Sequence, residues 1–135
     1  ALSIVFVVTV TSILSAIFIS LGSNIPMKES IMVSSGLGWY SLSVVLNSDF
    51  IGPYYGIITF LTDFSREVLV LVTVPLLRNL LSIELVGYAA NTAMDFCLPV
   101  IRNNLGTKMV PLAISVGLIF TIVTPFLLMF ENSFL

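Results

Sequence analysis

The chain has 135 residues, of which 58% are hydrophobic and only 9% are charged, and its formal net charge is −2. A soluble domain carries about 25% charged residues, and one small core cannot bury so much apolar surface. The composition therefore predicts a membrane protein. The chain has no histidine and one cysteine, Cys97, which excludes histidine catalysis, an internal disulfide and a multi-cysteine metal site. Five scattered basic residues form no nucleic-acid footprint, and no cofactor or metal is expected.

Three strong apolar segments divide the chain. Residues 1–21 carry no charge and are long enough to span a bilayer as a helix. A polar break at 22–24 ends this segment. Further strong segments run over 56–77 and over 109–130, and the last of these is uncharged throughout. We expect all three to be firm transmembrane helices.

Two weaker hydrophobic segments lie between the strong ones, over 31–48 and 82–101. The first is rich in glycine and serine, and the second is interrupted by small and amide residues and ends near Pro99. Weak, interrupted segments of this kind indicate discontinuous helices in transporters. We therefore predict an all-α integral membrane protein with a single transmembrane domain over 1–135. It has three transmembrane helices and two short discontinuous or re-entrant helical segments, without a clear internal repeat.

Segment 56–77 carries three charges around its middle: Asp63, Arg66 and Glu67. Each charge near a helix centre costs about 2.5–3.5 kcal/mol on an insertion scale, whereas each large apolar residue returns about 0.3–0.6 kcal/mol. Their i, i+3, i+4 spacing puts them on one helical face, so we expect that face to meet protein or water. Two interpretations stay open: a proton relay or cation site in which Arg66 neutralises one carboxylate, or a self-paired structural cluster.

Asp95 is the most informative single residue, because the ten residues before it and the six after it are uncharged. A carboxylate there binds a cation, a proton or a basic partner, or else lies at a water-exposed loop end. Trp39 and Tyr40 offer ring faces for a ligand ammonium, or form an interfacial aromatic belt. Ser41 and Ser43 either offer hydroxyls to a ligand or ion, or pack.

Enzyme interpretations are weak. Two intramembrane aspartates suggest an aspartyl protease, but Asp63 lacks a preceding Gly-x-Gly and Asp95 lacks a tyrosine directly before it. A serine hydrolase lacks its histidine base, and no phosphate-binding loop of the Gly-Lys-Ser type is present. We therefore expect that the chain is not an enzyme.

Three motifs occur in one order along the chain. They are GWYSLS at 38–43, DFSRE at 63–67 followed by VPLLR at 74–78, and NTAMDFCLPVI at 91–101 followed by MVP at 109–111. Together they resemble the C-terminal half of the LysO-type lysine exporter family, over most of the chain from about residue 36. The resemblance implies a multi-pass protein of the prokaryotic plasma membrane that exports L-lysine or related basic amino acids, drawing on the proton gradient.

Members of that family are about twice as long as this chain. The resemblance therefore implies half of a working unit, which pairs in the lipid bilayer with an identical copy as a homodimer or with a separate N-terminal half. Some residues also depart from the family pattern. Tyr88-Ala89 replaces a glycine pair, Ala93 a serine, Cys97 a threonine and Val44 a glycine. These changes bear on substrate identity more than on fold.

The resemblance also implies roles for individual residues. Asp95 takes the place of the acid in the family's Met-Asp-Phe-x-Leu-Pro motif, and would attract the lysine ammonium or carry a proton. Asp63 and Glu67 would be relay or coupling groups, while Arg66 would separate their pKa values or bind the substrate carboxylate. The site would be lined by Trp39, Tyr40, Ser41, Ser43, Asn91 and Thr92. The alternatives are a non-transporting structural membrane subunit and a channel.

Overall fold

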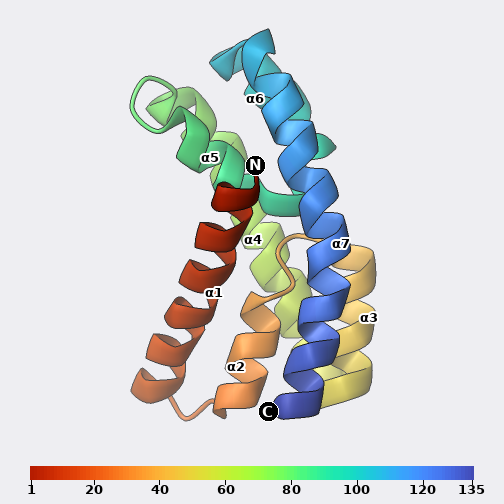
Figure 1. Ribbon diagram of the computed structural model, residues 1–135. Helices are drawn as coiled ribbons and strands as arrows, with labels where there is room; N and C mark the ends of the chain where they lie inside the picture. The colour runs from red at the N-terminus through yellow and green to blue at the C-terminus, as the bar shows by residue number, and fades with distance from the viewer.

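The computed structural model describes residues 1–135 and consists of helices and their connections, without strands (Figure 1). The three long helices are α1 (Leu2–Gly22), α4 (Pro53–Leu77) and α7 (Val110–Phe134). The short helices are α2 (Met27–Ser34), α3 (Tyr40–Ile51), α5 (Ser82–Ala89) and α6 (Leu98–Leu105), with 3-10 turns η1 (Ala90–Met94) and η2 (Thr107–Met109). The prediction of an all-helical chain is confirmed.

Helices α2 and α3 form a helical hairpin, which we call the first hairpin. α2 runs back along α1, with the Ser30 hydroxyl donating to the Ala16 carbonyl at 2.8 Å. α3 runs antiparallel to α4, with the Asn47 amide donating to the Thr59 hydroxyl at 2.8 Å. The hairpin therefore enters and leaves at the end of the molecule where α1 ends and α4 begins (Figure 1). Its turn, residues 35–39, is the first tip.

Helices α5 and α6 form a second hairpin, which enters from the opposite end, where α4 ends and α7 begins (Figure 1). Its turn, residues 90–97, is the second tip, and η1 within it packs on the middle of α7. A Cβ on Gly117 of α7 would lie 2.6 Å from Met94 Cγ, so the two backbones approach closely there. The buried apolar core includes residues on both sides of this contact, and Phe120 of α7 is its largest fully buried side chain.

The two tips meet inside the molecule. The backbone N–H of Asn91 donates to the Leu37 carbonyl at 3.2 Å. Both tips use left-handed backbone, with φ of 51° at Leu37, 83° at Gly38 and 51° at Ala90. Glycine adopts this conformation freely, whereas leucine and alanine are strained in it. Leu37 and Ala90 are both fully buried, so tertiary packing holds the strained turns in place.

The same order of elements thus occurs twice, in opposite directions. α1 is followed by a hairpin from one end, and α4 is followed by a hairpin from the other (Figure 1). The sequence shows no repeat because the two hairpins share a backbone path rather than a residue pattern. Oppositely directed repeats with broken helices are a common architecture of secondary transporters.

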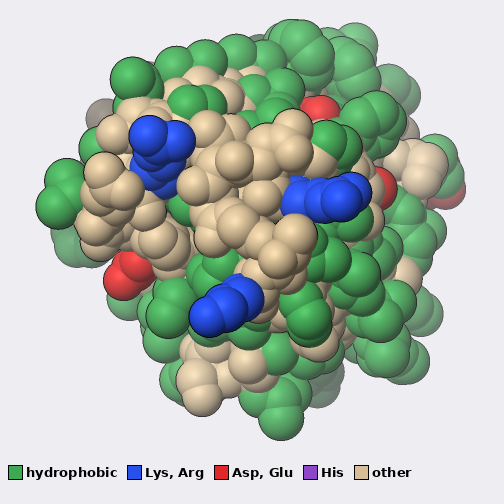
Figure 2. Space-filling view, turned by 90° about the horizontal axis from the view of Figure 1, so that it is seen from above, with side chains coloured by type: hydrophobic (Ala, Val, Ile, Leu, Met, Phe, Trp, Pro, Cys, Tyr) green, Lys and Arg blue, Asp and Glu red, His purple; other side chains and the backbone are tan.

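The outer surface is strongly apolar. Only 33 of 135 residues are buried, and α1 buries only Val5 and Ala16. Figure 2 shows hydrophobic side chains around the rim of the molecule, with basic side chains gathered on the end face. Two helices are long and apolar enough to cross a membrane, Leu2–Gly22 and Thr107–Phe134. α4, which has three charges in its 25 residues, does not meet that test, so two of the three expected spans are supported.

Candidate functional site

Asp63 of α4 lies against the first tip and is 1% exposed. Its carboxylate accepts hydrogen bonds from the Gly38 N–H at 2.9 Å and from the Ser43 hydroxyl at 3.0 Å. A Cβ on Gly36 would lie 3.0 Å from both Asp63 Oδ2 and Ser43 Cβ, so any side chain there would press on the carboxylate and on Ser43. Hydrogen bonds to a charged acceptor are the strong kind, and they offset part of the cost of burying it.

Glu67 continues this polar contact one turn further along α4. The Tyr40 hydroxyl donates to the Glu67 carboxylate, and it also lies 3.3 Å from the Asp63 carbonyl oxygen. Tyr40 and Ser43 both belong to α3, so the α3–α4 interface holds two carboxylates, each of which accepts a hydrogen bond from one hydroxyl. We call Asp63, Glu67, Tyr40 and Ser43 the carboxylate chain.

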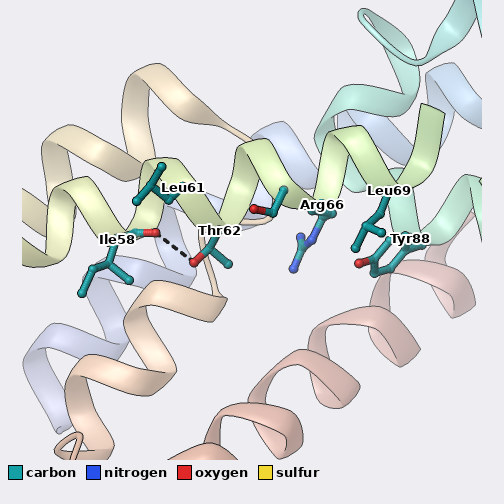
Figure 3. Close-up of a pocket in the computed structure, with 7 residues that line it drawn as sticks. Ile58, Leu61, Thr62, Arg66, Leu69 and Tyr88 are labelled. Atoms are coloured by element: carbon teal, nitrogen blue, oxygen red, sulfur yellow. Dashed lines mark hydrogen bonds between the residues drawn. The ribbon is translucent and has the colours of Figure 1, made fainter. Parts of the chain in front are cut away.

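Arg66 points away from α3 and lines two cavities on another side of α4. It lines two neighbouring cavities of about 430 and 550 Å³, and Thr62 and Tyr88 line both of them as well. Its guanidinium carbon lies 5.8 Å from the centroid of the Tyr88 ring, and its Nη1 is buried without a hydrogen-bond partner. Figure 3 shows Arg66 projecting from α4 beside Tyr88. Successive helical residues are about 100° apart, which places Glu67 with α3 and Arg66 with the cavities.

The three charges of α4 therefore do not form a self-paired cluster. Asp63 and Glu67 take their hydrogen bonds from Gly38, Ser43 and Tyr40, and Arg66 donates to neither carboxylate. The sequence placed all three on one face, and the structure divides that face between two neighbouring surfaces. Arg66 forms no direct ion pair with either carboxylate in this conformation, and its neutralisation of a carboxylate over a longer distance stays a prediction.

The larger cavity lies between α1, α4 and α5. Its walls combine apolar side chains of α1 with the small hydroxyl residues Ser12 and Ser15, and Glu84 of α5 also lines it. A volume of about 550 Å³ is within the usual range for small-molecule sites. Arg66 supplies a positive charge to a largely apolar space, which suits a small anionic group attached to an apolar body.

Asp95 lies in the second tip and is exposed. Its Oδ1 accepts a hydrogen bond from the Phe96 N–H at 2.6 Å, and its carbonyl accepts one from the Leu98 N–H at 3.2 Å, at the start of α6. It makes no contact with the carboxylate chain. In the first hairpin, Trp39 is half-buried and Ser41 is exposed, so neither side chain contributes a hydrogen bond to Asp63.

Asn91 and Thr92 build the second tip. The Asn91 amide donates to the Thr124 hydroxyl at 3.2 Å and accepts from the Thr121 hydroxyl at 3.3 Å, which ties the tip to α7. The Thr92 hydroxyl lies 3.2 Å from the Cys97 sulfur. Both residues are buried, and their polar groups hold the tip together in this conformation.

Four helix ends converge on the two tips. α2 and α5 direct their C-terminal ends toward the tips, whereas α3 and α6 begin there. Helix C-termini carry partial negative charge and N-termini partial positive charge. An amino acid carries both signs, and discontinuous helices bind such substrates at this kind of junction in transporters.

Two site features escaped the sequence analysis. Gly36 provides the space for Asp63, but nothing in the sequence distinguishes it from the other glycines of its segment. Glu131 was left outside the last apolar segment, yet it is 4% exposed and accepts from the Ser35 hydroxyl at 2.8 Å. The available signal was its position directly after an uncharged apolar segment of spanning length.

Comparison with known proteins points to one family. The family model described as "Lysine exporter LysO" matches residues 1–131. A Haemophilus influenzae protein, named as a candidate lysine exporter, is 35% identical over 126 residues, which are 93% of this chain and 65% of that protein. The protein named lysine exporter LysO from Escherichia coli K12 is 35% identical over 128 residues, which are 94% of this chain and 42% of that protein. The chain therefore spans less than two thirds of the length of either relative. No solved structure matches.

Proposed function

Since the chain belongs to the lysine exporter LysO family, we propose that it exports L-lysine or a related basic amino acid across the prokaryotic plasma membrane. It acts as a multi-pass protein and draws on the proton gradient. One observation carries the proposal: two hairpins from opposite ends meet beside Asp63, a buried carboxylate. Substrate and coupling-ion sites of secondary transporters lie at junctions of this kind.

The charged groups of the proposed substrate are complementary to Asp95 and Arg66. Lysine carries two ammonium groups and one carboxylate. In the proposal, Asp95 attracts an ammonium group, and the unpartnered Nη1 of Arg66 binds the carboxylate in the cavity that Tyr88 also lines. Guanidinium pairs with a carboxylate through planar, charge-assisted hydrogen bonds.

Protons are the proposed coupling ion, and the carboxylate chain is the proposed relay. Asp63 and Glu67 lie one turn apart, and hydroxyls of Ser43 and Tyr40 contact their carboxylates. Hydroxyl groups both donate and accept hydrogen bonds, so each can exchange a proton with the carboxylate that it contacts. Intramembrane acids commonly serve this purpose in transporters.

The working unit in this proposal contains more than one such chain, either two identical copies or this chain with a second half. Each relative contains residues beyond the part that this chain matches, so the family's unit is larger than these 135 residues. Long helices with large exposed apolar side chains also support it, since such faces pack against lipid or against another helix.

The test is efflux of labelled lysine, arginine and ornithine from vesicles, with and without a pH gradient. We expect saturable lysine efflux that the gradient accelerates. Asp95→Asn should abolish efflux without changing stability, because Asp95 is exposed and bonds only to its neighbouring backbone. Asp49→Asn, at another exposed acid, is the matched control.

Three results would contradict the proposal. Unchanged efflux in a folded Asp95→Asn variant would remove its substrate role. Failure of that variant to assemble would support a structural subunit, and flux that never saturates would support a channel.

A further inference from the structure

Glu131 is the only charged residue of α7, and none of the roles proposed above uses it. It is 4% exposed, although it lies near the end of the helix. Its Oε1 accepts a hydrogen bond from the Ser35 hydroxyl at 2.8 Å. Its Oε2 is also buried and has no hydrogen-bond partner. A carboxylate enclosed in this way has one donor for two oxygens.

No cation pairs directly with this carboxylate. Lys28 of α2 donates instead to the carbonyl of the next residue, Asn132, at 3.1 Å. The other charged side chain of α2 is an acid, Glu29, and the only one of α3 is the exposed Asp49. α1 and η1 carry no charged side chain. The remaining elements that contact α7 bring Glu84 (α5), Arg102 (α6) and Lys108 (η2), all exposed.

Glu131 also anchors the first tip through its hydrogen bond with Ser35. Ser35 begins that tip, and Gly38, three residues later, donates its N–H to Asp63. The tip is therefore held at both ends by carboxylates, one from α7 and the other from α4. A change in the protonation of Glu131 therefore acts on the same short turn that donates a hydrogen bond to Asp63.

From this geometry we infer that Glu131 is a proton-binding site, which carries a proton in the conformation described here and releases the first tip when it loses that proton. A neutral acid tolerates burial with one hydrogen-bond donor, whereas a carboxylate needs more donors, a cation or water. Proton loss therefore drives Glu131 toward water and breaks its bond with Ser35. The inference rests on the proposed function only in that the released tip belongs to the proposed transport site.

The chain contains one tryptophan, Trp39, and it lies at the end of the first tip. Its fluorescence therefore reports movement of that tip without any substrate. The purified natural protein in detergent is titrated from about pH 4 to about pH 9, a range that brackets ordinary glutamate titration and leaves room for perturbed values. Subtracting the signal of Trp39→Phe isolates Trp39.

We expect a Trp39 emission shift that follows a single protonation. Glu131→Gln should keep the low-pH emission throughout, because glutamine mimics the neutral acid. Ser35→Ala should remove the response while Glu131 remains, which keeps the test valid if Glu131→Gln fails to fold. Asp49→Asn should respond like the wild type.

The inference is overturned if wild-type Trp39 emission does not change with pH, or if folded Glu131→Gln still responds. It is also overturned if Glu29→Gln abolishes the response and Glu131→Gln does not. Absence of lysine efflux in the wild type would instead refute the proposed function, and it would leave this fluorescence result intact. The two failures are therefore distinguishable.

Discussion

The backbone N–H of Asn91 donates to the carbonyl of Leu37 at 3.2 Å, and this is the one backbone hydrogen bond between the two hairpins. The side chain of Asn91 binds Thr121 and Thr124 of α7 at the same time. One residue therefore fixes the second tip both to the first tip and to α7.

Asn91→Ala should destabilise the protein. The substitution leaves the buried hydroxyl of Thr124 without its amide partner, and Thr121 keeps only its bond to the Gly117 carbonyl. Lost buried hydrogen-bond partners cost about 1–3 kcal/mol, so the thermal midpoint in detergent should fall by several degrees. Asn103→Ala, at an exposed position of α6, should leave the midpoint unchanged; equal midpoints for the two variants would contradict the assignment.

Gly36→Ala should impair lysine efflux. The new methyl group would lie 3.0 Å from both Asp63 Oδ2 and Ser43 Cβ, so the carboxylate or the tip must move. Gly22→Ala is the matched control, because a Cβ there meets nothing within 4 Å. Efflux in vesicles at equal protein content provides the comparison. Normal efflux in Gly36→Ala would show that the close contact between Gly36 and Asp63 is not needed for transport.

Tyr40→Phe and Glu67→Gln should weaken pH-driven efflux by similar factors. Both variants break the same hydrogen bond between the Tyr40 hydroxyl and the Glu67 carboxylate. The double variant should be little worse than either single one, with an interaction energy of about 0.5–3 kcal/mol in a double-mutant cycle. Additive effects on the efflux rate would mean that the two groups act independently.

Arg66→Gln should raise the KM for lysine, by about tenfold if one charge-assisted hydrogen bond is lost. The decarboxylated diamine of lysine has no carboxylate, so its inhibition of efflux should be the same in the variant and the wild type. Tyr88→Phe keeps the ring beneath Arg66 and should keep the wild-type KM. If Arg66→Gln weakened the diamine as much as lysine, the carboxylate role would be wrong.

The all-helical fold follows from the sequence because long apolar segments leave their backbone few alternatives to helix in a lipid environment. The break after Ser34 falls in a glycine-rich stretch, and the break near Pro99 falls where small residues precede a proline. Both helix breaks are therefore predictable from the local sequence. The left-handed backbone at Leu37 and Ala90 has no such signal, because packing across the two tips imposes it.

The site was less predictable than the fold. Helical spacing grouped Asp63, Arg66 and Glu67, but spacing fixes only angles about one helix and not which neighbour occupies each angle. α3 packs against the side of α4 that carries Asp63 and Glu67, and the cavities lie against the side that carries Arg66. The burial of Glu131 likewise depends on α2 packing over the end of α7, a long-range contact that no local pattern contains.

The opposed hairpins also set how thick the barriers inside the molecule are. α2 and α5 have eight residues each, which at 1.5 Å per residue is a depth of about 12 Å. The hydrocarbon layer of a bilayer is about 30 Å thick. In the proposed exporter, a concentration or voltage difference therefore falls across the short hairpins rather than across full-length helices. Under that proposal, shifting a single hairpin changes which of the two solutions reaches the meeting point, while the opposite hairpin keeps the other solution out.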